Sequence, residues 1–155
     1  MIAILAVFFA TAFPSNSKTS WMRPESFHLT IGMSRAAAVQ ALDAGGWKAK
    51  RGDDDQQLVV EYAEDKSLTL QFERERLKSA RFELFTILQD APKAFDEERA
   101  FLRQALGKPR MKSQKIVVYD QILPNVMAVL SADPNSEQAQ KGVGMLVVRY
   151  YDPAK

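Results

Sequence analysis

The sequence predicts an α+β fold in which an antiparallel sheet carries two helices on one face. A helix pattern with start and stop signals occurs twice, beginning at Ser34 and at Asp96. Each pattern is followed by three short segments of strand-forming residues, and strands joined by short turns pair antiparallel. The composition, 46% hydrophobic and 26% charged over 155 residues, is typical of one globular domain. We therefore expect a single domain over residues 18–155, with two similar halves at about 27–90 and 91–155, each a helix followed by three strands.

The chain begins with an uncharged apolar run at residues 2–13, which predicts a signal peptide. The run is shorter than the roughly twenty residues that a transmembrane helix needs. Ala10-Thr11-Ala12 supplies the small-x-small pattern of a cleavage site, and residues 15–17 supply a second one. No Lys or Arg precedes the run, so an N-terminal core strand or helix is the alternative. We expect residues 1–17 to be a signal peptide with the start of a linker, and the protein to be periplasmic or secreted.

The first helix is expected over the alanine-rich residues 35–44. Ser34 is a favourable N-cap because its hydroxyl accepts a hydrogen bond from the free amides of the first turn. Gly45 and Gly46 end the helix, since glycine adopts the left-handed conformation without steric cost. Strands are expected over residues 58–62, 68–72 and 77–85, where polar and apolar residues alternate.

The second helix is expected to begin at Asp96, because a carboxylate there and two glutamates after it suit the helix dipole. Gly107 and Pro109 are the stop signals. Strands are expected over residues 116–119, 126–130 and 145–151. The polar residues 133–144 predict a long exposed loop, and residues 142–144 (GVG) predict a turn before the last strand, because the motif lacks the Lys-Ser/Thr of a phosphate loop.

Composition excludes several classes of function. The chain has no Cys, which excludes disulfides, thiolate metal sites and a cysteine nucleophile. With 21 basic and 19 acidic side chains the net charge is only +2, so no strong field favours nucleic acid. The single histidine, His28, has no catalytic partner that the sequence identifies, and we expect it to be structural. The sequence identifies no catalytic, cofactor-binding or metal-binding residue, and no transmembrane span.

Three charged segments are candidates for chemistry, and each has a simpler interpretation. Residues 53–55 (DDD) resemble a cation ligand set but lack the Gly and distal Glu of a calcium loop, so we expect a solvated turn. Glu73, Glu75 and Glu83 are candidates for the two carboxylates of a glycosidase-type acid/base pair. They alternate with arginines, however, and this alternation predicts cross-strand charge pairs instead. Residues 99–115 carry six basic residues and no acidic one, which in an exported protein suits contact with an acidic protein or a lipid headgroup, but we expect a solvated helix face and loop. Those six basic residues are Arg99, Arg103, Lys108, Arg110, Lys112 and Lys115.

The first half also resembles a known family. The segment Leu29-Thr30-Ile31-Gly32-Met33-Ser34, the alanine-rich helix with its Gly-Gly stop, and residues 68–72 followed by Arg76-Leu77 resemble the small outer-membrane-assembly lipoproteins. The two-block order resembles the β-lactamase-inhibitory-protein-like fold. The resemblance covers residues 29–84, and it implies the fold and a role in protein contact. The lipobox cysteine is absent, and Gly-x-Pro follows the second helix instead of the first.

Together these patterns favour an exported, non-enzymatic binding or accessory protein that contacts an envelope or secreted protein. The alternatives are an inhibitor or immunity-type protein of a secreted enzyme, and a small carboxylate-dependent hydrolase. Exposed aromatic residues at Trp47, Tyr62 or Tyr150 would favour binding. The surface expected to bind is the sheet face without helices, because four apolar residues fall in its phase, with residues 133–144 at its rim. Those four residues are Val60, Phe85, Ile87 and Tyr151.

We predict that the signal peptide is removed after Ala12 or, second, after Ser17. Sequencing the N-terminus of the protein isolated from its native compartment checks this. An intact Met1 on protein recovered from a cytosolic fraction would contradict it.

Overall fold

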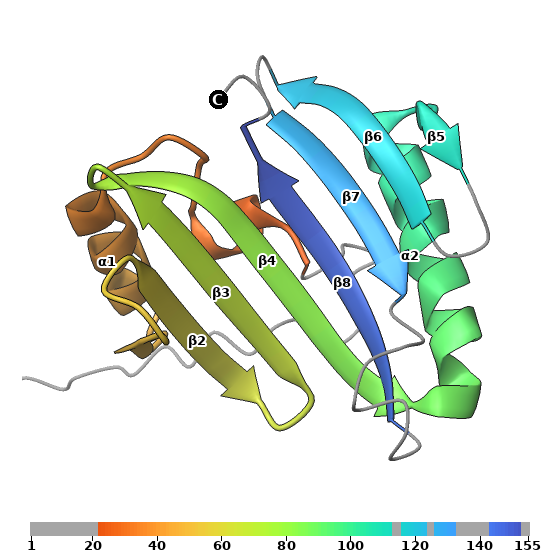
Figure 1. Ribbon diagram of the computed structural model, residues 1–155, viewed down its shortest axis with the longest axis horizontal. Helices are drawn as coiled ribbons and strands as arrows, with labels where there is room; N and C mark the ends of the chain where they lie inside the picture. The colour runs from red at the N-terminus through yellow and green to blue at the C-terminus, as the bar shows by residue number, and fades with distance from the viewer. Residues whose placement is uncertain (1–21, 113–115, 124–125, 133–142, 153–155) are drawn as a thin grey trace, which may run out of the picture.

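The computed structural model describes residues 22–112, 116–123, 126–132 and 143–152. Eight antiparallel strands form one sheet in the order β1-β2-β3-β4-β8-β7-β6-β5. The helices lie behind this sheet in the view of Figure 1. The α+β class with an antiparallel sheet is thus confirmed, whereas the sheet has more strands than expected.

The first half runs from a short 3-10 helix to β4. Its elements are η1 (Pro24–Phe27), α1 (Arg35–Ala44), β1 (Ala49–Arg51), β2 (Gln57–Ala63), β3 (Lys66–Glu73) and β4 (Arg76–Ile87). The Ser34 hydroxyl accepts a hydrogen bond from the Ala37 amide at 3.2 Å, as expected of an N-cap. Gly45 ends α1 and Gly46 has a φ of +78°, so the predicted stop is confirmed.

The second half runs from the end of β4 to β8. Its elements are η2 (Leu88–Asp90), α2 (Ala91–Leu106), β5 (Met111–Lys112), β6 (Ile116–Leu123), β7 (Val126–Ala132) and β8 (Val143–Tyr151). The prediction that Asp96 caps this helix is wrong, because the N-cap position of α2 is six residues earlier, at Asp90. Pro92 explains the early start, since proline is pre-organised for the first helical turn. Asp96 instead lies within the helix and pairs with Arg99 at 2.8 Å.

The strands differ from the expectation in two ways. Each helix is followed by four strands, because the short edge strands β1 and β5 precede the three expected ones. Two or three residues are too few to show an alternating pattern. The predicted loop at residues 133–144, with its turn at residues 142–144, also extends too far along the chain. Strand β8 already begins at Val143, which lies opposite Ile87. That pairing equally explains why β4 continues beyond Phe85; the rest of the loop, residues 133–142, lies outside the described residues.

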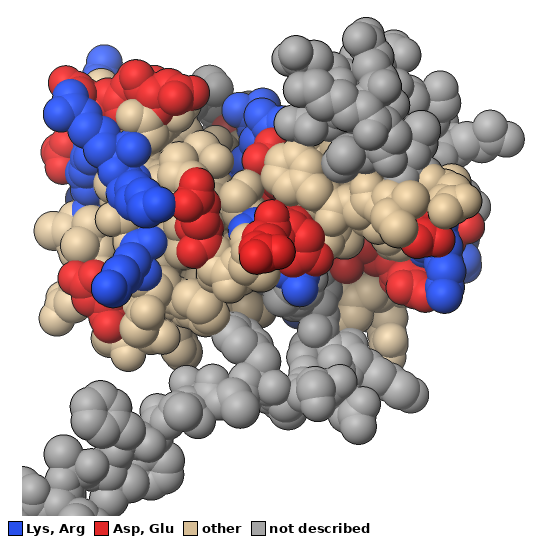
Figure 2. Space-filling model, turned by 90° about the horizontal axis from the view of Figure 1, so that it is seen from below, with Lys and Arg blue, Asp and Glu red and all other residues tan. Residues whose placement is uncertain are grey.

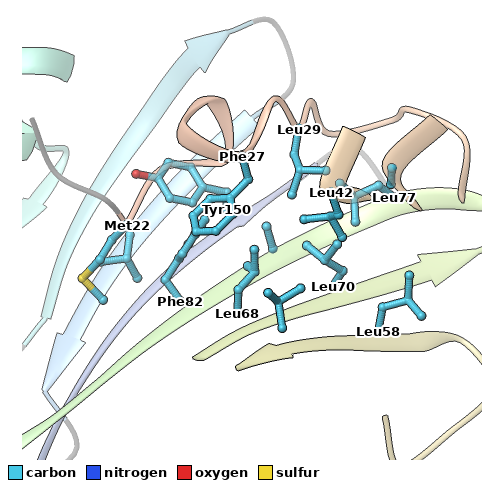
Figure 3. Packing of buried hydrophobic residues seen from close by; sticks show 14 of the residues in the cluster. Met22, Phe27, Leu29, Leu42, Leu58, Leu68, Leu70, Leu77, Phe82 and Tyr150 are labelled. Carbon is cyan, nitrogen blue, oxygen red and sulfur yellow. The ribbon is translucent and has the colours of Figure 1, made fainter. Parts of the chain in front are cut away.

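The hydrophobic core lies between the sheet and the helical layer. Figure 3 shows Phe27, Leu29 and Leu42 from the helical layer pointing toward side chains of the strands. On the strands the core uses one alternating phase, and α2 contributes Phe95 and Leu102 to the same cluster. The strand residues in the cluster are Leu58, Val60, Leu68, Leu70, Phe72, Leu77, Ala80, Phe82, Leu146, Val148 and Tyr150. Both helices therefore cover the same face of the sheet.

Of the three aromatic residues considered for a binding surface, Tyr150 is buried in this core, and Trp47 and Tyr62 are partly buried and pack against it. Tyr150 is 3% exposed and packs edge-on against Phe82, with ring centroids 5.9 Å apart. Trp47 and Tyr62 both pack against Phe27, each at 5.3 Å between centroids. The exposed aromatic residues that would favour binding are therefore not found at these three positions, because each ring contributes its apolar area to the core.

We predict that the buried tyrosines make the protein unfold at high pH. Burial, and secondarily the Glu98 carboxylate, raises the pKa of Tyr150 well above its ordinary value. The unfolded chain ionises near pH 10 while the folded chain must keep the proton. The free energy of unfolding is therefore unaffected below that pH and falls above it, by up to about 1.4 kcal/mol per pH unit per tyrosine.

Urea unfolding followed at pH 8 to 11 checks this, and Tyr150→Phe is expected to reduce the slope above pH 10. Its hydroxyl has no hydrogen-bond partner within the described residues, so the variant is expected to fold normally. Equal slopes for the wild type and the variant would contradict the prediction.

Candidate functional site

The strongest candidate site is the face of the sheet that faces the viewer in Figure 1, opposite the helices. Along each strand every second side chain points to this face, because successive side chains alternate. Strands β4 and β8 lie at the centre of the sheet and pair directly. We call their outward-facing residues the central face; they are Arg81, Glu83, Phe85, Ile87, Met145, Val147, Arg149 and Tyr151.

Charged residues occupy one half of the central face. Arg81 lies directly opposite Arg149 in the β4–β8 register, and like charges in that position repel each other. The Glu83 carboxylate offsets one of them, since it pairs with the Arg81 guanidinium at 2.7 Å. Glu83 also accepts a hydrogen bond from the Ser67 hydroxyl at 2.9 Å. The carboxylate pairs with Arg81 alone, so these two arginines and one glutamate leave a net positive charge.

Arg149 carries the excess charge, and its environment is aromatic. Its guanidinium carbon lies 5.9 Å from the centroid of the Tyr151 ring, which is a cation–π distance. Arg149 is exposed, and no carboxylate pairs with it within the part of the chain that the structure describes. A stacked guanidinium is held in a defined direction and remains available to a planar carboxylate.

Apolar residues occupy the other half of the central face. Phe85 lies opposite Met145, and both are half-buried. Ile87 ends the row and is 59% exposed, a high value for a large aliphatic side chain. Val147, which is nearly buried, lies between the charged and the apolar half. The central face therefore joins a cation to a neighbouring apolar surface on two rigid strands.

The sequence located part of this face correctly. Phe85, Ile87 and Tyr151 lie on it, as expected. The prediction that Val60 lies on the central face is wrong, because Val60 is fully buried in the core and its neighbour Val59 faces outward. The sequence does not predict that Arg81 and Arg149 lie opposite each other. No local pattern indicates which distant strand lies beside β4, so no sequence signal for the pair exists.

The peripheral strands add polar side chains to the same face. Lys50 on β1 hydrogen-bonds Glu61 on β2 at 2.8 Å. This contact holds the pKa of the Glu61 carboxyl below its ordinary value. Thr69 lies between Val59 and Arg81 in register. The polar edge around an apolar and cationic centre resembles the arrangement of a protein–protein interface.

The three aspartates at residues 53–55 form an exposed turn between β1 and β2. The Asp54 side chain accepts a hydrogen bond from the Gln56 amide at 2.7 Å, and Asp55 pairs with Arg51. Among the described residues no group of three or more acidic or histidine side chains is placed to hold a metal ion. The turn is therefore explained by its own hydrogen bonds and ion pair.

The glutamates considered as an acid/base pair are spread over two places. Glu73 and Glu75 lie at the β3–β4 turn, where Glu73 pairs with Lys78 across the hairpin at 3.1 Å. Glu83 lies on the central face. The structure thus pairs Glu73 with Lys78 at the turn and places Glu83 elsewhere, so these two carboxylates do not share one site.

The basic segment at residues 99–115 follows the exposed side of α2 and the turn after it. Arg99 pairs with Asp96, and Arg103 is exposed. Figure 2 shows acidic and basic side chains interspersed over the face of the molecule drawn there. Lys115 lies outside the described residues.

His28 has a backbone role in the structure. It ends η1 with a φ of +56°, and its amide donates to the Glu25 carbonyl at 3.1 Å. Its side chain is exposed. These features fit the structural role expected from the sequence.

No helix within the described ranges is both long enough and apolar enough to cross a membrane. The predicted signal peptide at residues 1–17 lies outside those ranges. Comparisons of the chain with family models, with curated proteins and with solved structures find no match. The function is therefore argued from the central face itself.

We predict that Glu83 stabilises the fold mainly by reducing the electrostatic repulsion between Arg81 and Arg149. Glu83→Gln is expected to lower the free energy of unfolding by about 0.5–1 kcal/mol, because it leaves like charges directly opposite each other. In an Arg149→Gln background the same change is expected to cost about half as much, since one of the repelling charges is gone.

Urea unfolding of the four proteins of this cycle, at low and at high salt, measures the coupling. High salt is expected to reduce it, because exposed charges are screened. A cost of Glu83→Gln that is the same in both backgrounds would contradict the prediction.

Proposed function

We propose that this protein is an exported, non-enzymatic binding protein that contacts another envelope or secreted protein through its central face. The observation that carries the proposal is the combination of Arg149, whose charge no described carboxylate offsets, with the apolar residues Phe85, Ile87 and Met145 on the same two strands. Neither the exposure of Ile87 nor the placement of Arg149 opposite Arg81 stabilises the fold. Both are features of interfaces, where arginine and large apolar side chains supply most of the binding energy.

The central face is suited to a partner with an apolar contact and a nearby carboxylate. Ile87 and Phe85 would lose water on contact, and Arg149 would gain a carboxylate, which none of the described residues supplies at this position. The backbone of β4 and β8 is hydrogen-bonded on both sides, so it needs little ordering on binding. A rigid surface keeps more of its contact energy as affinity.

We also propose that the chain consists of two similar halves, in the manner of the β-lactamase-inhibitory-protein-like fold. In each half one helix is followed by four strands, and the order β1-β2-β3-β4 is mirrored by β8-β7-β6-β5. The last strands of the two halves meet at the centre of the sheet. This kinship would place the central face at the junction of the halves.

The two alternatives make different demands on the structure. An inhibitor would use the same surface, and it differs in that its partner is an enzyme whose activity it suppresses. A carboxylate-dependent hydrolase needs two acidic groups that share one site. Glu73 is engaged by Lys78, and Glu83 by Arg81 and Ser67, so the described carboxylates favour binding over hydrolysis.

The proposal is tested by affinity capture from the native envelope with the wild type and with Ile87→Glu and Arg149→Glu. A specific partner is expected to be captured by the wild type and to be lost with both variants, because each places a negative charge on the contact surface. The melting temperatures are expected to stay within about 2 °C of the wild type, since surface substitutions cost little stability.

The matched control is Gln40→Glu, which adds the same charge on the exposed side of α1, away from the sheet face. It is expected to keep the partner. If all variants retain the same set of partners as the wild type, the central face is not the binding surface and the proposal is wrong.

A further inference from the structure

A second feature of the molecule lies at the opposite end of β4 from Ile87, where β3 turns into β4. In Figure 1 this turn is at the upper left, beside the segment that leads from η1 to α1. A pocket of about 520 Å³ lies there, within the range of small-molecule sites. Its lining residues are Gly32, Glu73, Arg74, Arg76, Leu77, Lys78 and Asp152.

Three irregularities of the backbone converge on this pocket. The first is the two-residue turn itself, in which Arg74 and Glu75 have φ values of +49° and +59°. Turns of this kind are normally made by Asn-Gly or other small residues, because a side chain with a Cβ is strained there. The strained turn places the Arg74 side chain at the wall of the pocket.

The second irregularity is a β-bulge at Lys78. Gln71 pairs with Ser79 and Phe72 pairs with Leu77, so Lys78 is an extra residue in β4. Bulges redirect a side chain out of the normal alternation. Lys78 is one of the lining residues of the pocket, and its ammonium pairs with Glu73 at 3.1 Å.

The third irregularity is Gly32, which has a φ of +93°. A Cβ built at this position would meet no atom within 4 Å, so the backbone here is open to approach. The Gly32 carbonyl accepts a hydrogen bond from Arg76 at 3.3 Å, and the Gly32 amide donates to the Leu77 carbonyl at 2.7 Å. The first of these bonds holds the Arg76 guanidinium at Gly32, and both residues line the pocket.

The charges of the lining leave the pocket positive. Glu73 offsets the charge of Lys78. Of the remaining charged lining residues, Arg74 and Arg76 are positive and only Asp152 is negative. Neither of these arginines has an ion pair within the described residues. Strained backbone residues cluster at functional sites, and arginine binds carboxylate and phosphate groups through paired hydrogen bonds.

We propose that this pocket binds a small oxyanion, a phosphate or carboxylate group, through Arg74 and Arg76 with Lys78 as the third cation. The site is separate from the central face, and it does not depend on the proposed function. In this proposal the left-handed conformation of Arg74 and Glu75 costs stability, and its role is to direct Arg74 toward the bound anion.

The test uses the full chain with inorganic phosphate and, in a parallel titration, citrate, each at constant ionic strength set with chloride. Amide shifts in a ¹⁵N–¹H spectrum are expected to saturate at Gly32, Lys78 and Asp152 with at least one of the two anions. The anion that saturates at the lower concentration identifies the group that the pocket prefers. No saturable shift with either anion would overturn the proposal.

The decisive variant replaces Arg74-Glu75 by Asn-Gly, the pair that this turn prefers. The variant R74N/E75G is expected to melt about 3–5 °C higher than the wild type, because the strain is removed. It is also expected to bind the anion at least tenfold more weakly. A purely structural turn would show the gain in stability without the loss of binding, and this result would overturn the proposal.

Arg103→Ala is the matched control, since it removes one exposed arginine from α2, far from the turn in sequence. It is expected to leave the anion affinity within twofold of the wild type. Arg74→Ala removes the same charge at the pocket and is expected to weaken binding. If the two variants weaken binding equally, the anion responds only to net charge, and the pocket is not a site.

Discussion

The antiparallel pairing of β4 with β8 is the interaction on which the rest of this structure depends. It runs from Ser79 opposite Tyr151 to Ile87 opposite Val143, and it joins the strands of the first half to those of the second in one sheet. Because the pairing fixes the register, Phe82, Val148 and Tyr150 all point to the helical side. A shift by one residue would exchange the core face for the solvent face.

This register also creates the central face. Arg81 and Arg149 are 68 positions apart along the chain, and they become neighbours only because their strands pair. The same holds for Phe85 and Met145. The chemistry proposed for binding is therefore a product of the sheet, since no single strand carries both the excess cation and the complete apolar surface.

The ends of β4 differ in how regular they are. At the Ile87 end the strand continues its alternation to the last residue, whereas the other end combines a bulge at Lys78 with left-handed residues at Arg74 and Glu75. β8 ends at Tyr151, and the segment before α1 takes its place beside β4, with Ser34 opposite Arg76. The pocket lies where these segments meet, which explains why its walls come from three separate parts of the chain.

The sequence by itself determined the fold class, the first helix with its cap and stop, and the six longer strands. These features depend on local rules: a capping hydroxyl at Ser34, the permissive glycines after α1, and alternation along residues 68–72. The start of α2 was misplaced because Asp96 and Asp90 give the same local signal. Only the tertiary structure decided that Val60 and Tyr150 are buried, that two short edge strands complete the sheet, and that Arg81 faces Arg149. The physical reason is that burial and pairing depend on contacts between residues far apart in the chain, which no local periodicity records.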